Sequence, residues 1–117
     1  MNLTQETQNQ TTTLHAQGRL DFEAAGHFQQ ELEKSVASAA TDGNALLIDC
    51  GSLEYVSSAG LRVFLVAARA AKAANVPFAV YALTPAVKEV FDVSGFARII
   101  DVLGDRAGAL EKVGRHA

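Results

Sequence analysis

Short apolar segments alternate along this chain with longer segments in which apolar residues recur every third or fourth position. The segments "ALLID" at 45–49 and "PFAVYAL" at 77–83 are almost continuously hydrophobic, which is typical of strands buried on both faces of a sheet. A helical pattern follows each of them, with a length that suits a right-handed crossover connection. The alternation therefore predicts an α/β fold with a mostly parallel central sheet, covered by about four helices.

The predicted order of elements is β-β-α-β-α-β-α-β-α. Strands are expected at 3–7, 11–17, 45–49, 77–83 and 97–103. Helices are expected at 22–40, 61–74, 85–94 and 105–113. The first two strands would form a hairpin that turns at Gln8-Asn9, so the N-terminal strand would be an antiparallel edge strand. Asp21 and Thr84 stand where the N-caps of the first and third helices are expected.

The composition narrows the classes of function. With 117 residues the chain fits a single domain, residues 1–117 with a core at about 3–113. A net charge of −3 and the lack of a basic run argue against direct binding of nucleic acid. No apolar run approaches the roughly 20 residues of a membrane-spanning helix, so membrane insertion is not expected. The first ten residues carry no secretory signal and the chain has one cysteine, so we expect a cytoplasmic protein.

Motifs of catalysis and metal binding are absent from the sequence. The nucleophile elbow G-x-S-x-G, the Walker loop and the dinucleotide pattern G-x-G-x-x-G do not occur. The histidines are His15, His27 and His116, and none pairs with Cys50 or with an acid at metal-ligand spacing. We therefore expect no enzyme, no catalytic residue, no metal and no cofactor. Cys50 is expected to be a small buried hydrophobic residue, with a reactive thiol as the alternative.

Two serines, Ser57 and Ser58, lie where the central strand gives way to the second helix. One of them is expected to cap that helix. This end of a central parallel strand is also where open α/β sheets place their functional loops, and Gly60 would allow another backbone to approach closely. A phosphate here would meet free N–H groups and the positive end of the helix dipole. From the residues alone, a helix cap and a phosphorylation site both remain open.

Three segments together resemble the STAS domain family, and in particular the bacterial anti-sigma factor antagonists. They are "GRLD" at 18–21, "LLIDCGSLEYVSSAGLRVFL" at 46–65 and "VYALTPAVKEVFDVSGF" at 80–96. The resemblance extends over about 3–113 and implies a protein switch without catalysis of its own. In the family, the unphosphorylated antagonist binds an anti-sigma factor that is also a serine kinase of the histidine-kinase-like ATPase fold, and a sigma factor is released. Phosphorylation by that kinase separates the complex, and a metal-dependent serine phosphatase restores the binding form.

The resemblance also implies roles for particular residues. The family motif D-S-S-G-L, with its first serine phosphorylated, corresponds to "SSAGL" at 57–61. Ser58 then matches the phosphorylated serine, while Ser57, the alternative acceptor, replaces the family's acid and Ala59 replaces the second serine. Asp21 matches a family acid that lies near the acceptor. The expected partner-binding residues are Asp21, Tyr55, Ser57, Ser58, Ala59, Gly60, Leu61 and Arg62.

Some of these residues are also compatible with other roles. Asp21 could act as a cap, a contact or both, Tyr55 could be a core aromatic, and Arg62 could be a solvated surface charge. Two other functions stay open as well. The chain could be a STAS subunit of a lipid-transport or membrane-transporter complex that binds a partner without phosphorylation. It could also be an enzyme with Ser58 as nucleophile, although no base is placed to activate that serine.

Overall fold

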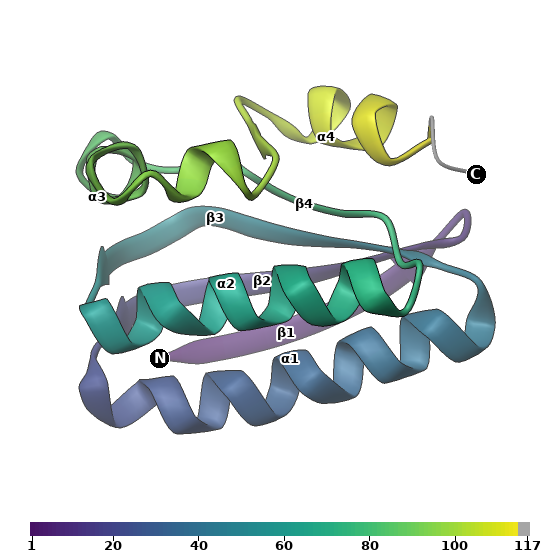
Figure 1. Cartoon of the computed structure of the whole chain (residues 1–117), viewed down its shortest axis with the longest axis horizontal. Coiled ribbons are helices and arrows are strands. Elements are labelled where there is room, and N and C mark those ends of the chain that lie inside the picture. Colours follow the sequence, from purple (N-terminus) through teal and green to yellow (C-terminus); the bar gives the residue numbers. More distant parts are fainter. Residues whose placement is uncertain (115–117) are drawn as a thin grey trace.

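A five-stranded sheet with strand order β1-β2-β3-β4-β5 forms the centre of the protein (Figure 1). The structure is a computed structural model and describes residues 1–114. The strands are β1 (Asn2–Gln8), β2 (Thr11–Leu20), β3 (Ala45–Val56), β4 (Phe78–Tyr81) and β5 (Val102–Leu103). The helices are α1 (Phe22–Asp42), α2 (Ser58–Ala73), α3 (Pro85–Ser94), the 3-10 turn η1 (Phe96–Arg98) and α4 (Arg106–Gly114). His116 lies outside the described residues.

The pairing of the strands confirms the predicted α/β class. β1 pairs antiparallel with β2, and the pairs β2–β3, β3–β4 and β4–β5 are all parallel. The edge strand is therefore antiparallel and β3 is central, as the sequence predicted. None of the helices of residues 1–114 has the length and hydrophobicity needed to cross a bilayer.

The two faces of the sheet are covered differently. Successive side chains of a strand point to opposite faces, so Ile48 lies in the core beneath α1 and α2 while Leu47 lies on the face that α4 covers. Figure 1 shows α1 and α2 side by side on one side of the sheet and α4 on the other. On the first face the rings of Phe28, Phe64 and Phe91 stack edge to face, with centroid distances of 5.2 and 5.3 Å. These rings join α1, α2 and α3 in one core.

The predicted hairpin turn is wrong by one residue. The turn residues are Asn9 and Gln10, because Gln8 still pairs with Thr11 in the ladder. Both turn residues have positive φ, 53° and 63°, as the two-residue turn that matches strand twist requires. Asparagine adopts this left-handed conformation more readily than most residues.

The central strand is longer than predicted, since β3 runs to Val56 rather than ending at Asp49. Its second half lacks a continuous apolar run, but Leu53 and Val56 are buried beneath the helices. β2 also continues to Leu20 and supplies a partner for this half, with Leu20 paired to Val56. Pairing with β2 therefore extends the strand to the beginning of α2.

The predicted last strand at 97–103 is mostly wrong. Only Val102 and Leu103 pair with β4, and the preceding residues form η1. Gly95 turns the chain with φ of 80°, and the N–H groups of Ile99 and Ile100 both donate to the carbonyl of Phe96 at 2.9 Å. The turn buries Ile100 in the core, so the apolar content of this segment serves packing rather than strand pairing.

Candidate functional site

The N-termini of α1 and α2 lie together at the end of the two central strands. Leu20 ends β2 and Val56 ends β3, and the two residues are paired. The N–H of Ser57 then donates to the carbonyl of Leu20 at 2.8 Å, which holds the two chain segments together beyond the sheet. Both helices therefore start from the same edge of the sheet (Figure 1).

Asp21 is the N-cap of α1, as predicted. Its backbone is extended, with φ −86° and ψ −176°, and its Oδ1 accepts a hydrogen bond from the N–H of Ala24 at 2.9 Å. The side chain is half-buried. The capping role is thus confirmed, and the partner-contact role stays a prediction.

The two serines occupy different positions in α2. Ser57 is the N-cap, and its Oγ accepts a hydrogen bond from the N–H of Gly60 at 3.1 Å. Ser58 is the first residue of the helix, which starts three residues earlier than predicted, and its side chain is exposed. Within residues 1–114 the Ser58 hydroxyl makes no hydrogen bond. Of the two hydroxyls, only that of Ser58 is both exposed and unoccupied.

At Gly60 the first turn of α2 lies close against the end of β2. A Cβ added there would lie 2.5 Å from Cγ and 2.9 Å from the carbonyl oxygen of Leu20, so no larger residue fits. This confirms the predicted close approach of another backbone, which is that of Leu20 in the same chain. Gly60 and Leu61 are both buried, so they shape this surface without being exposed on it.

Tyr55 and Arg62 lie on the surface. Tyr55 is 41% exposed, which excludes the core interpretation, and the guanidinium of Arg19 lies 4.4 Å from the centroid of its ring. Arg19 pairs with Tyr55 across β2 and β3, so the register brings them together. Arg62 is exposed one turn beyond Ser58, while Ala59 is half-buried.

Two exposed residues of this end were not predicted from the sequence. Arg19 is the arginine of "GRLD". Its contact with the ring of Tyr55 becomes visible only once the pairing of β2 with β3 is known. Phe22, the first residue of α1, is 80% exposed. Its position outside the apolar stripe of Phe28, Leu32 and Val36 was the signal that could have identified it.

The structure gathers several polar side chains on the face of the sheet that α4 partly covers. His15 Nδ1 lies 2.8 Å from Asp49 Oδ2, and His15 Nε2 lies 3.1 Å from Glu6 Oε1. Burial disfavours the charged imidazole, but the hydrogen bonds to Glu6 and Asp49 outweigh it and raise the pKa of His15 above its ordinary value. Arg106 of α4 donates to Thr13 Oγ1 at 3.1 Å and to the Tyr81 hydroxyl at 3.3 Å. Within residues 1–114, no group of three or more His, Cys, Asp or Glu side chains could hold a metal ion.

Cys50 lies inside β3 rather than after a strand, and it is fully buried. Burial, together with the nearby Asp49 charge, raises the pKa of its thiol far above the ordinary value. The thiol is therefore not a nucleophile near neutral pH. This supports the buried-hydrophobe interpretation over the reactive one.

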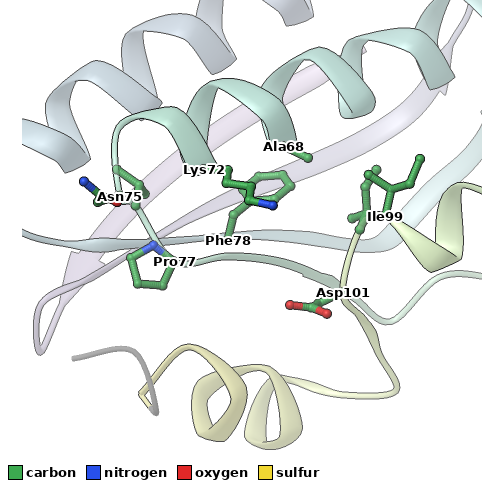
Figure 2. A pocket seen from close by; sticks show the side chains of 9 residues that line it. Ala68, Lys72, Asn75, Pro77, Phe78, Ile99 and Asp101 are labelled. Atoms are coloured by element: carbon green, nitrogen blue, oxygen red, sulfur yellow. The ribbon is translucent and has the colours of Figure 1, made fainter.

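A groove of about 500 Å³ lies at the other end of α2, away from the serines. Figure 2 shows that it is formed by the last turns of α2, the start of β4 and the segment before β5. Its lining includes Lys72, Phe78, Ile99 and Asp101. None of the residues predicted for partner binding lines this groove.

Comparisons with known proteins agree with this fold. A family model described as "Mlab, STAS domain" matches residues 3–104. The chain is 37% identical over 81 residues to BtrV of Bordetella bronchiseptica, a protein assigned to the anti-sigma factor antagonists; the match covers 68% of this chain and 70% of BtrV. These two matches identify a family.

Solved structures of other proteins share the fold. An anti-sigma factor antagonist from Mycobacterium paratuberculosis has a TM-score of 0.85 and 22% identity, over 97% of this chain and 93% of that chain. The phosphorylated form of the Bacillus cell fate determinant SpoIIAA has a TM-score of 0.66 and 18% identity, over 96% of this chain and 99% of that chain. At these identities the similarity shows the fold alone.

Proposed function

The chain belongs to the STAS domain family, and on that basis we propose that it is an anti-sigma factor antagonist controlled by phosphorylation of Ser58. The anti-sigma factor antagonists of this family are binding and regulatory proteins. In the proposed cycle the unphosphorylated chain binds an anti-sigma factor with serine kinase activity, and a sigma factor is released. The chain contributes a surface and an acceptor hydroxyl, without catalysis or a cofactor of its own.

We choose Ser58 over Ser57 because the two hydroxyls differ in hydrogen bonding and in exposure. Ser57 Oγ already accepts the capping hydrogen bond from Gly60, and its side chain is half-buried. Ser58 is exposed at the first position of α2, where a kinase could reach it. Its Oγ would attack the γ-phosphorus of ATP in the kinase, releasing ADP and the hydroxyl proton. The product is a phosphoserine beside the free N–H groups of a helix N-terminus, where the fold tolerates an anion.

Phosphorylation would change the surface without unfolding the protein. A phosphoserine adds about −1.5 to −2 charges at neutral pH. That charge would stand at the end of the sheet where Asp21 already lies, and a bound partner would have to desolvate both. We therefore expect the phosphorylated form to lose the anti-sigma factor. A metal-dependent serine phosphatase would restore the binding form, and the whole cycle would run in the cytoplasm.

Affinity capture from the source organism with Ser58→Ala as bait identifies the partner. Recovery of a histidine-kinase-like ATPase supports the proposal. Recovery of a transporter ATPase would instead support the transporter-subunit alternative.

Phosphorylation by the captured kinase then tests the site. With ATP, intact-mass analysis should show one added phosphate on wild type and on Ser57→Ala, and none on Ser58→Ala. Ser57→Ala is the matched control, since it removes the cap but keeps the proposed acceptor. Ser58→Glu should bind the kinase much more weakly than Ser58→Ala. A phosphate on Ser58→Ala would refute the assignment.

A further inference from the structure

Phe22 differs from the phenylalanines of the core. Phe28, Phe64 and Phe91 are fully buried, whereas Phe22 leaves 80% of its surface in water. Most of its ring lies outside the core, so its burial against a partner would contribute favourable free energy to binding. Aromatic side chains are enriched among the residues that dominate binding energy at protein interfaces.

Phe22 lies at the same end of the molecule as Ser58. Each is the first residue of its helix, directly after the capping residues Asp21 and Ser57. The hydrogen bond from Ser57 N–H to the Leu20 carbonyl ties the two helix starts together, and α1 and α2 run side by side from there. A partner that covers the start of both helices could therefore contact Ser58 and Phe22 together.

Gly26 adds an independent observation on the same side of α1. It follows Phe22 by four residues, so the two positions are neighbours on the helix surface. A Cβ added at Gly26 would meet nothing within 4 Å, and its φ is not in the left-handed region, so the fold itself does not require glycine. Glycine inside a helix is destabilising relative to alanine. What it permits is a close approach of another backbone to the helix.

We propose that Phe22 and Gly26 form a docking face for the anti-sigma factor, next to Ser58. Phe22 inserts into an apolar pocket of the partner, and Gly26 lets a partner backbone lie against the first turns of α1. The inference rests on the proposed function, because the occupant is the anti-sigma factor that binds at Ser58. Half-buried Asp21 and exposed Glu23 stand directly before and after Phe22 in the sequence, so the rim of the partner's pocket should carry basic side chains.

Two substitutions test this face, with the anti-sigma factor recovered by Ser58→Ala as the purified probe. Phe22→Ala should weaken binding at least tenfold while its thermal midpoint is not lowered. Gly26→Ala should bind at least threefold more weakly although it unfolds at higher urea concentration than wild type. A residue with a merely structural role would not combine greater stability with weaker binding. Val93→Ala is the matched control, since Val93 is 82% exposed on α3, and its affinity should equal that of wild type.

The outcomes separate this inference from the proposed function. If the wild-type chain does not bind the anti-sigma factor, the proposed function fails. If wild type binds and either Phe22→Ala or Gly26→Ala binds as tightly as Val93→Ala, the docking face is wrong while the proposed function stands.

Discussion

At the scale of single residues, His15 is held by two carboxylates from different strands. Its ring nitrogens contact Glu6 of β1 and Asp49 of β3, and the pKa of His15 is raised above 6.5 because these hydrogen bonds outweigh burial. The folded protein thus binds the proton more tightly than the unfolded chain. The resulting stabilisation is fully present below the ordinary pKa and is lost as the pH rises through the folded value.

His15→Gln should remove this pH dependence. The difference in free energy of unfolding between wild type and His15→Gln should be larger at about pH 5.5 than at about pH 8.5. Urea unfolding across this range measures it, and His27→Gln on the exposed side of α1 is the control. A difference that stays constant or grows with pH would contradict the prediction.

The residues of the candidate site could be predicted from the sequence only in part. Ser57, Ser58 and Gly60 stand in one short motif between a strand and a helix, so their placement follows from local sequence. The ring contact of Arg19 with Tyr55 depends on the register between β2 and β3. This register is shifted twice by irregularities in the strand pairing. No local pattern encodes such a shift. The His15 cluster was missed for another reason: its members come from three different strands, β1, β2 and β3, whose pairing is not written in any local segment.

At the scale of elements, the start of α1 depends on one side chain with two possible roles. Asp21 caps the helix through the N–H of Ala24, and it is also a predicted partner contact. Asp21→Ala should lower the free energy of unfolding by about 0.5–2 kcal/mol, because it removes the cap. Asp21→Asn should keep most of that stability, since asparagine caps a helix about as well as aspartate.

Binding then reports the other role of Asp21. If its charge contacts the anti-sigma factor, Asp21→Asn should weaken binding in an isothermal titration while its urea midpoint stays near that of wild type. A large loss of stability in Asp21→Asn would mean that the carboxylate charge, rather than the capping hydrogen bond, holds the start of α1.

The elements predicted best are those whose ends are marked by capping or helix-ending residues in the sequence. Thr84 caps α3 and the helix spans Pro85–Ser94, both as predicted, and Gly95 ends it in the left-handed conformation. β5 was overpredicted because an apolar segment can be buried as a turn as well as a strand, and periodicity does not distinguish the two. β3 was underpredicted because its second half depends on pairing with β2, which lies more than thirty residues away in sequence.

At the scale of the whole molecule, the two faces of one sheet pack against different helices. β3 sends Ile48 into the core beneath α1 and α2, and it sends Leu47 towards α4. The alternation of strands and helices was enough to predict this layered arrangement. Which side chains lie on the α4 face could not be predicted, because its apolar cluster is small, polar groups such as Thr13 and Arg106 lie beside it, and α4 is short.

Because both faces share the same strands, they should unfold together. Phe64 lies at the centre of the larger core, between the rings of Phe28 and Phe91. Phe64→Ala should lower the free energy of unfolding by about 3–5 kcal/mol, a large part of the roughly 5–15 kcal/mol of an ordinary domain. Native-state hydrogen exchange should show equal losses at the amides of Leu32 in α1 and of Ala109 in α4, although the two helices cover opposite faces of the sheet. The matched control is Phe22→Ala, which removes an exposed ring and should change stability by less than about 0.5 kcal/mol. Loss of protection at Leu32 without loss at Ala109 would show that the two faces open independently.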